Sequence, residues 1–333
     1  MHKDTILEVK NLHKTFTSKG ITVKAVSDVS FEVSPGETIG IVGESGCGKT
    51  TLGRCIVRAY SASKGEVLYR TRAGEEVDFL KVDKKKMKEI RKEIQMIFQD
   101  PYSSLNPRMT VLDIIKEPLR ANYPKMPKDE MDQKAKQMAE KVGLNPTYLM
   151  RYPHAFSGGQ RQRIGIARAL IVEPQIIVCD EAVSALDVSI QAQVINLLRD
   201  LQKDLNLTYL FISHDLSVVE HISDKVGVMY LGKMVEFGDT EELFKHPMHP
   251  YTEALLSAVP VADPTVQIDR IPLKGEIPNP ANPPSGCYFH ERCHYCTEKC
   301  AQVAPEYKEL APNHFVVCHR AEELKLRGFD YDE

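Results

Sequence analysis

The sequence lacks several features that would each point to a particular class of protein. It has no run of eighteen apolar residues, so we expect no segment that spans a membrane as a helix. The net charge is −3 at pH 7, so the chain lacks the excess of positive charge that is typical of proteins that bind nucleic acid. The first residues, MHKDTILEVKNL, lack the apolar core of a secretory signal, and we therefore expect the chain to remain in the cytosol.

The strongest cluster of like charge is the basic stretch KKKMKEIRK at 84–92. It could be a patch that binds nucleic acid, or the solvated face of a helix that precedes a strand. We favour the helix, because charge runs of this length are typical of exposed helical faces.

A glycine-rich segment, GESGCGKT at 43–50, follows the apolar, β-branched residues 38–42. The apolar residues predict a buried strand. The glycines allow the backbone N–H groups to turn inward around phosphate oxygens, and a helix that begins near Lys49 would direct its positive dipole end at the same anion. The pattern predicts that Lys49 contacts the β- and γ-phosphates of ATP and that the Thr50 hydroxyl binds Mg²⁺. The residues expected around the nucleotide are Gly43, Glu44, Ser45, Gly46, Cys47, Gly48, Lys49, Thr50 and Thr51.

A second apolar run, IIVC at 176–179, ends in Asp180 and Glu181. A strand here would place both carboxylates at the carboxyl edge of a parallel sheet, where α/β folds bind their ligands. We predict that Asp180 holds Mg²⁺, directly or through water, and that Glu181 polarises the water that attacks the γ-phosphate.

With these motifs the chain resembles the ABC ATPase family, and the resemblance implies roles for further residues. Gln99 matches the glutamine that contacts the metal or its water, and His214 matches the histidine that contacts the γ-phosphate. Phe16 stands where the family stacks an aromatic ring on adenine. Ala182 departs from the proline that is usual after the glutamate, a change that we interpret as tolerated. The implied catalytic residues are Glu181, His214 and Gln99, and the implied Mg²⁺ ligands are Thr50, Gln99 and Asp180.

The resemblance also implies a dimer. Ser157, Gly158, Gly159 and Gln160 match the family signature, and Asp187 ends the segment 184–187 that crosses the dimer. A helix that begins near Ser157 offers N–H groups and a hydroxyl to an anion, which in the family is the γ-phosphate held by the other subunit. Two subunits would face each other head to tail and enclose two ATP molecules.

Five of the eight cysteines lie between residues 287 and 318, after a proline-rich segment at 278–286. In a cytosolic chain such clustering favours a metal over disulfides. The spacing alone gives zinc and an iron–sulfur cluster about equal weight, because only Cys293 and Cys296 have CxxC spacing, and cysteines without a metal are the minor alternative. Cys47, Cys55 and Cys179 belong to the ATPase core, where small buried residues are the better interpretation.

The C-terminal part is similar to the oligopeptide and dipeptide branch of ABC importers, and the chain resembles the second ATPase subunit of those systems. The shared segments are FQDPYSSLNPRMTV (98–111), HPMHPYTEALLSAVP (246–260), LKGEIPNPANPPSGCYFHERC (273–293) and VVCH (316–319). Members of this branch can hold a [4Fe–4S] cluster, and the matching positions are Cys287, Cys293, Cys300 and Cys318. Cys296 is additional and leaves the ligand set open. We expect the cluster to be structural, with redox sensing as the alternative.

We therefore predict an α/β protein with the P-loop NTPase fold of ABC ATPases. It would comprise a nucleotide-binding domain at 1–245, with a β-rich start and a helical subdomain at about 99–170, and a Cys-rich extension at 246–333. The implied partners are a second ATPase subunit, expected to be a different one, two permease subunits and, indirectly, an extracytoplasmic substrate-binding protein. No nucleic-acid partner is expected. The chain would work on the cytoplasmic face of a prokaryotic plasma membrane.

The sequence leaves several alternatives open. The cargo could be a nickel chelate, glutathione or an oligosaccharide in place of a peptide. A soluble ABC ATPase of DNA repair or translation is remote, because the chain has neither a long inserted coiled coil nor a second cassette. A regulatory iron–sulfur module with a vestigial ATPase is disfavoured by the intact catalytic positions.

Overall fold

The computed structural model describes residues 1–2, 4–100, 102–260 and 270–329. Pro101, in one of the segments shared with the importer branch, and residues 261–269 and 330–333 of the predicted extension lie outside the described residues. The chain folds into two compact units. The first comprises Met1–Glu8, Glu32–Glu37 and Leu68–Ile212, and the second comprises Val9–Phe31, Thr38–Val67 and Ser213–Glu333.

The first unit contains a parallel sheet and most of the long helices. Its strands are β5 (Glu76–Asp78), β6 (Ile94–Ile97), β7 (Ile176–Asp180) and β8 (Thr208–Ile212). Its helices are α2 (Lys84–Glu93), α3 (Val111–Asn122), α4 (Lys128–Lys141), α5 (Gly158–Leu170) and α6 (Val188–Leu205), with short 3-10 helices η1 (Pro146–Tyr148) and η2 (Pro153–Ala155).

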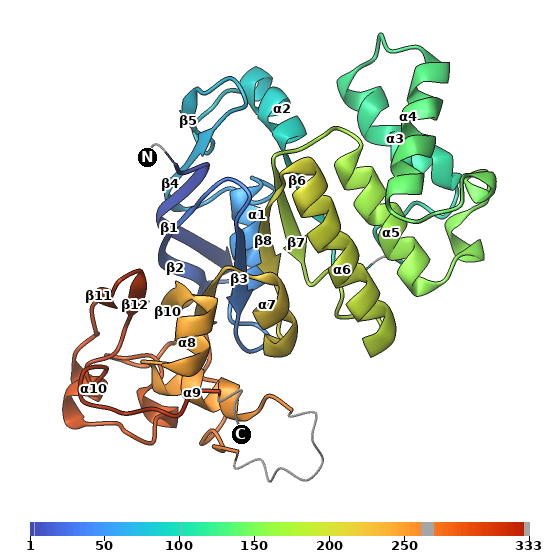
Figure 1. Ribbon diagram of the computed structural model, residues 1–333. Helices are drawn as coiled ribbons and strands as arrows, with labels where there is room; N and C mark the ends of the chain where they lie inside the picture. The colour runs from blue at the N-terminus through green and yellow to red at the C-terminus, as the bar shows by residue number, and fades with distance from the viewer. Residues whose placement is uncertain (3, 101, 261–269, 330–333) are drawn as a thin grey trace. The chain divides into compact units, whose positions relative to one another are not determined.

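Strands β6, β7 and β8 run parallel, with Ile97 opposite Cys179 and Asp180 opposite Ile212. Every residue of β7 and β8 is buried, as expected for central parallel strands in which apolar residues predominate. Helices α3, α4 and α5 pack on one another as a helical group (Figure 1). The basic stretch forms α2, in which Ile90 is the buried residue, so the favoured interpretation as a solvated helix is confirmed.

The second unit contains the remaining strands and helices. Its strands are β1 (Leu7–Ser18), β2 (Ile21–Val33), β3 (Thr38–Val42), β4 (Lys64–Arg70), β9 (Lys225–Tyr230), β10 (Lys233–Asp239), β11 (Lys308–Ala311) and β12 (His314–Val316), of which β1, β2 and β4 have most of their residues in this unit. Its helices are α1 (Lys49–Ile56), α7 (Leu216–Ile222), α8 (Thr240–Lys245), α9 (Pro250–Ser257) and α10 (Glu298–Gln302), with the 3-10 helix η3 (His290–Arg292).

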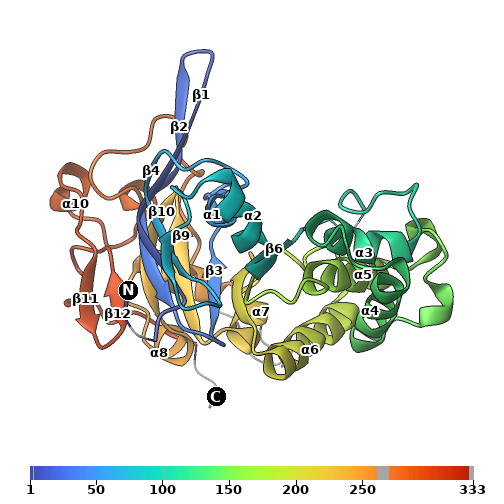
Figure 2. The same ribbon diagram turned by 90° about the horizontal axis from the view of Figure 1, so that it is seen from above.

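Strands β1 and β2 form a hairpin that runs to a narrow tip (Figure 2). The two turn residues, Lys19 and Gly20, both have positive φ, at 49° and 79°. Positive φ at both positions is typical of a type I′ turn, whose twist matches that of the strands it joins.

The C-terminal residues join the sheet of the second unit. Strand β9 pairs in parallel with β3, β10 pairs antiparallel with β9, and β12 pairs antiparallel with β10. Glu236 of β10 is fully buried and accepts hydrogen bonds from the backbone N–H groups of Met248 and His249, at 2.6 and 3.0 Å. Its carboxylate also lies 2.8 Å from Nε2 of His314 on β12. One buried carboxylate therefore connects β10, the residues that precede α9, and β12. The domain boundary predicted at 245/246 lies inside this unit and stays a prediction.

Candidate functional site

The phosphate loop lies in the second unit, between β3 and α1. Gly43 and Gly48 have φ of 143° and 108°, values that L side chains rarely adopt. A Cβ atom at Gly43 would lie 2.2 Å from the carbonyl oxygen of Met229, and one at Gly48 would lie 2.1 Å from that of Ala25. Backbone conformation and close packing therefore both require glycine at these two positions.

Lys49 is the first residue of α1, as its motif predicts, and is 4% exposed. Its ammonium donates hydrogen bonds to the carbonyl oxygens of Gly43, at 2.7 Å, and Glu44, at 3.0 Å. The first turn of α1 holds no acidic residue, so its N-terminus keeps its positive potential for an anion. Cys47 is buried beside Lys49, and burial raises the pKa of its thiol.

Phe16, the residue predicted to stack on adenine, is on β1 and is 38% exposed. Its ring meets that of Tyr60 edge-on with centroids 5.6 Å apart, and the ammonium of Lys14 lies 4.7 Å from its centre. The Tyr60 hydroxyl accepts a hydrogen bond from Arg54 of α1 at 2.9 Å. Phe16 therefore contacts Tyr60, which is hydrogen-bonded to the helix that begins at the phosphate loop. Tyr60 is a candidate site residue that the motifs do not reveal.

The predicted acidic residues lie in the first unit at the end of β7. Asp180 is fully buried, and Glu181 follows it with φ of 47°, in the left-handed region. Gln99 donates a hydrogen bond from Nε2 to Oε2 of Glu181 at 2.7 Å. The strand register explains this contact. Ile97 of β6 lies opposite Cys179 of β7, and Gln99 and Glu181 each come two residues after that pair.

The family signature lies at the start of α5, also in the first unit. Ser157 caps the helix and Gln160 completes a capping box: Ser157 Oγ accepts from the N–H of Gln160 at 3.3 Å, and Gln160 Oε1 accepts from the N–H of Ser157 at 3.0 Å. A Cβ at Gly159 would lie 2.4 Å from Cγ2 of Ile190, so glycine allows α5 to approach α6 closely. Gly158 begins the helix.

Asp187 caps α6, where its carboxylate accepts from the N–H of Ile190 at 3.0 Å. This hydrogen bond, together with that of Ser189, lowers the pKa of Asp187. His214 belongs to the second unit, in the exposed turn between Ile212 and α7. The second unit thus holds the phosphate loop, His214 and Phe16, while the first holds Gln99, Asp180, Glu181, the signature and Asp187.

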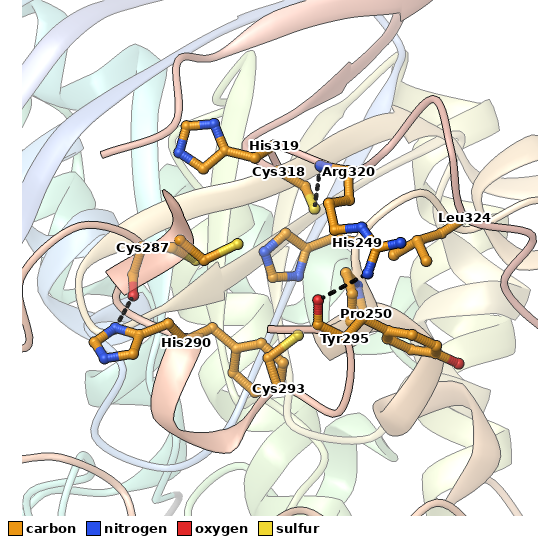
Figure 3. Close-up of a pocket in the computed structure, with 12 residues that line it drawn as sticks. His249, Pro250, Cys287, His290, Cys293, Tyr295, Cys318, His319, Arg320 and Leu324 are labelled. Atoms are coloured by element: carbon orange, nitrogen blue, oxygen red, sulfur yellow. Dashed lines mark hydrogen bonds between the residues drawn. The ribbon is translucent and has the colours of Figure 1, made fainter. Parts of the chain in front are cut away.

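The four cysteines predicted as ligands line one pocket of the second unit. The thiols of Cys287, Cys293 and Cys318 point toward the same space beside His249 (Figure 3), and Cys300 lines it as well. Cys296 is exposed and does not line it; its sulfur donates to the carbonyl of Thr297.

Burial in this pocket shifts the pKa values of several of its titratable groups. Burial, with smaller contributions from the neighbouring thiols, raises the pKa of Cys287 to about 12 and that of Cys293 to about 11. Burial alone lowers the pKa of His249 to about 3. Across the described residues, no group of three or more His, Cys, Asp or Glu is arranged to hold a metal ion. The arrangement of the side chains therefore does not support the iron–sulfur cluster or the zinc alternative. The four cysteines predicted as ligands nevertheless all line this pocket.

Two residues of the C-terminal part contact the phosphate loop, and the sequence motifs predict neither. Arg292 forms an ion pair with Glu44, and Tyr251 accepts a hydrogen bond from the Glu44 N–H. Both lie inside segments shared with the importer branch, which is the one signal that could have indicated them.

Comparisons with known proteins place these features in context. The family described as ABC transporter matches residues 26–184, and the family described as oligopeptide/dipeptide transporter, C-terminal region, matches residues 235–300. The chain is 54% identical to the oligopeptide transport ATP-binding protein AppF of Bacillus subtilis, over 96% of this chain and 98% of that protein. It is 52% identical to OppF of Haemophilus influenzae, over 95% of each chain, and 51% identical to OppF of Escherichia coli, over 95% and 94%.

Among solved structures, the chain is similar to a dimeric ATP-binding cassette in a post-hydrolysis state bound to ADP and Pi. The TM-score is 0.63 at 26% identity, and the match covers 71% of this chain and 99% of that one. Within the part of the chain that the structure describes, no helix is both long and apolar enough to cross a membrane.

Proposed function

We infer that the chain hydrolyses ATP to power peptide import, because it belongs to the ABC transporter family and, within that family, to the oligopeptide transport ATP-binding proteins. The observation that carries this function is similarity over nearly the whole chain, including the C-terminal region characteristic of peptide transporters. The named relatives are oligopeptide transport ATP-binding proteins, which favours this function over DNA repair or translation. The phosphate loop and the acidic residues at the end of β7 supply the parts that an ATPase needs.

Different residues of the site have different roles in phosphoryl transfer from ATP to water. The N–H groups of the phosphate loop and Lys49 bind the β- and γ-phosphates, and Phe16 with Tyr60 holds the adenine ring. Thr50, Asp180 and Gln99 are the residues that would hold Mg²⁺, which supplies positive charge against the phosphate oxygens when bound.

Glu181 accepts a proton from the attacking water, whose oxygen forms a bond to the γ-phosphorus. The bond between that phosphorus and the β–γ bridging oxygen breaks, and ADP leaves with the electron pair. The hydrogen bond from Gln99 fixes the orientation of the Glu181 carboxylate, and His214 contacts the γ-phosphate.

The signature completes the site from another subunit. Ser157 and the N–H groups at the start of α5 offer donors to the γ-phosphate held by that subunit, and Asp187 lies in the segment that crosses between them. We propose that the second subunit is a similar but distinct ATPase, and that the pair docks on two permease subunits at the cytoplasmic face of a plasma membrane. An extracytoplasmic binding protein would deliver the cargo.

Peptide uptake tests this function directly. In a host deleted for the gene, the wild-type chain should restore growth on a peptide that supplies a required amino acid, and Lys49→Ala should not, because it removes the cation that binds the phosphates. Restored uptake of a nickel chelate, glutathione or an oligosaccharide, without peptide uptake, would overturn the peptide assignment.

We also propose that Cys287, Cys293, Cys300 and Cys318 hold a [4Fe–4S] cluster that fastens the C-terminal residues. What supports it is that all four of these cysteines line one pocket, which Cys296 does not line. Buried thiols with raised pKa values stay protonated at neutral pH, and a cationic metal centre reverses that preference, so loading would release protons.

Metal analysis after purification without oxygen tests the cluster. We expect about four irons and four sulfides per chain, with a broad visible absorbance. Cys293→Ser should lose most of the iron and Cys296→Ser should keep it. Stoichiometric zinc without iron would show that the four cysteines hold zinc and not an iron–sulfur cluster. A metal-free chain with normal stability would overturn the proposal of a metal site.

A further inference from the structure

The residue that follows the first glycine of the phosphate loop is held by the C-terminal part of the chain. Arg292, in η3, is 5% exposed and donates two hydrogen bonds to the Glu44 carboxylate: Nη1 to Oε2 at 2.6 Å and Nη2 to Oε1 at 3.0 Å. Such a two-bond pair fixes the geometry as well as the charge of its acceptor.

A second contact fixes the backbone of the same residue. The N–H of Glu44 donates to the hydroxyl of Tyr251, which lies on α9 and is fully buried, at 2.9 Å. Both the side chain and the main chain of Glu44 are therefore held from outside the loop, by residues more than two hundred positions away in sequence.

Aromatic rings connect these contacts to the cysteine pocket. The ring of Tyr251 lies 4.8 Å from that of Tyr230 and 5.3 Å from that of Phe289, and Phe289 lies 5.6 Å from His249. Phe289 and His249 both line the pocket, and Figure 3 shows His249 beside the cysteines. A continuous set of packed side chains thus runs from the cysteines to the phosphate loop.

The charge of Glu44 explains why this contact matters for ATP. Glu44 is a carboxylate inside a loop that binds a polyanion, and its negative charge would oppose phosphate unless a cation neutralised it. Arg292 supplies that cation, because a guanidinium is always charged in proteins. The hydrogen bonds to Glu44 raise its pKa further. The guanidinium is further positioned by donation from Nε to the Lys274 carbonyl at 3.3 Å.

We propose that Arg292 and Tyr251 are positioning residues for ATP: through Glu44 they set the shape and charge of the phosphate loop, so that the order of the Cys-containing part determines nucleotide affinity. This rests on ATP binding by the chain and goes beyond it, because it gives the C-terminal part a role in the nucleotide site. By linkage, bound ATP should stabilise the C-terminal part in return.

Equilibrium binding of a fluorescent ATP analogue to the full chain tests the proposal, with thermal unfolding of each variant measured alongside. Arg292→Gln should weaken binding about tenfold, because it leaves the Glu44 charge without its partner. Arg292→Lys should recover part of that loss, since it restores the charge but not the paired geometry. Lys308→Gln on β11 is the matched control, a cation of the same region whose side chain is 63% exposed, and should bind as wild type.

The decisive variant is the double substitution Arg292→Gln with Glu44→Gln. It should bind ATP more tightly than Arg292→Gln alone, because it removes the unneutralised charge, whereas a purely structural role would make the double variant equal or worse. Tyr251→Phe, which keeps the aromatic packing, should weaken binding a few-fold even if Arg292→Gln does not fold. Wild-type affinity in folded Arg292→Gln and Tyr251→Phe would overturn the proposal. Failure of the wild-type chain itself to bind ATP would instead overturn the ATPase function.

Discussion

At the residue scale, Glu181 combines two features of a catalytic group. It adopts a left-handed backbone conformation that residues other than glycine rarely take, and its carboxylate is held by Gln99 at 2.7 Å. Strained backbone of this kind persists where the surroundings determine it, and it concentrates at functional positions.

This leads to a prediction for Glu181→Gln. The substitution keeps the size of the side chain and removes its ability to accept a proton, so hydrolysis in the assembled transporter should fall by about a hundredfold or more while ATP binding persists. Steady-state phosphate release and retention of labelled ATP measure the two effects. Normal hydrolysis by the variant would show that Glu181 is not the base.

The phosphate and acidic residues could be predicted from sequence because short motifs encode them locally. Lys49 follows its glycines directly, and Asp180 and Glu181 follow the apolar run at 176–179. Arg292 and Tyr251 could not be predicted, because their contact with Glu44 depends on packing across 248 and 207 residues of chain. Tyr60 was missed for a similar reason, since its partner Phe16 is on another element.

At the element scale, α5 carries both a stabilising cap and a proposed ligand group in the same serine. Ser157 Oγ accepts from the Gln160 N–H, which satisfies one of the donors that a helix start leaves without a partner. In the dimer the same hydroxyl would face the phosphate of the other subunit. These two roles predict different consequences of its removal.

Ser157→Ala should lower the free energy of unfolding by about 0.5–2 kcal/mol through loss of the cap. Thr110→Ala is the matched control, because Thr110 caps α3 of the same helical group by accepting from the Asp113 N–H at 3.2 Å. Both variants should lose similar stability in denaturant titrations, but only Ser157→Ala should lower ATPase activity in the complex, on the order of a hundredfold. Equal activities in the two variants would assign Ser157 to capping alone.

The helices and central strands were predictable for a physical reason, and the C-terminal strands were not. The apolar, β-branched residues 38–42 and the apolar run at 176–179 identify β3 and β7 from the order of their residues alone. The motifs likewise predict the helices that begin near Lys49 and Ser157, which are α1 and α5. Strands β11 and β12, of four and three residues, carry no such pattern. They form because β10 offers a pairing edge to β12, and β12 in turn pairs with β11.

At the scale of the whole molecule, the C-terminal residues are part of the ATPase fold as well as an addition to it. Composition suggested a proline-rich extension that needs a metal to become ordered. The structure adds β-pairing with β10, the buried Glu236 and the ion pair with the phosphate loop as further attachments. Sequence cannot reveal these attachments, because each joins residues that are distant in the chain.

The pairing of β10 with β12 has a consequence for solubility. Every residue of β10 from Met234 to Gly238 is buried, so a chain that ended before His314 would present a largely apolar strand with open backbone donors and acceptors along one side. Edges of that kind are templates for pairing with other chains and for aggregation. Strand β12 therefore protects the sheet as a cover strand, and shortened versions of this protein should be designed to end after it.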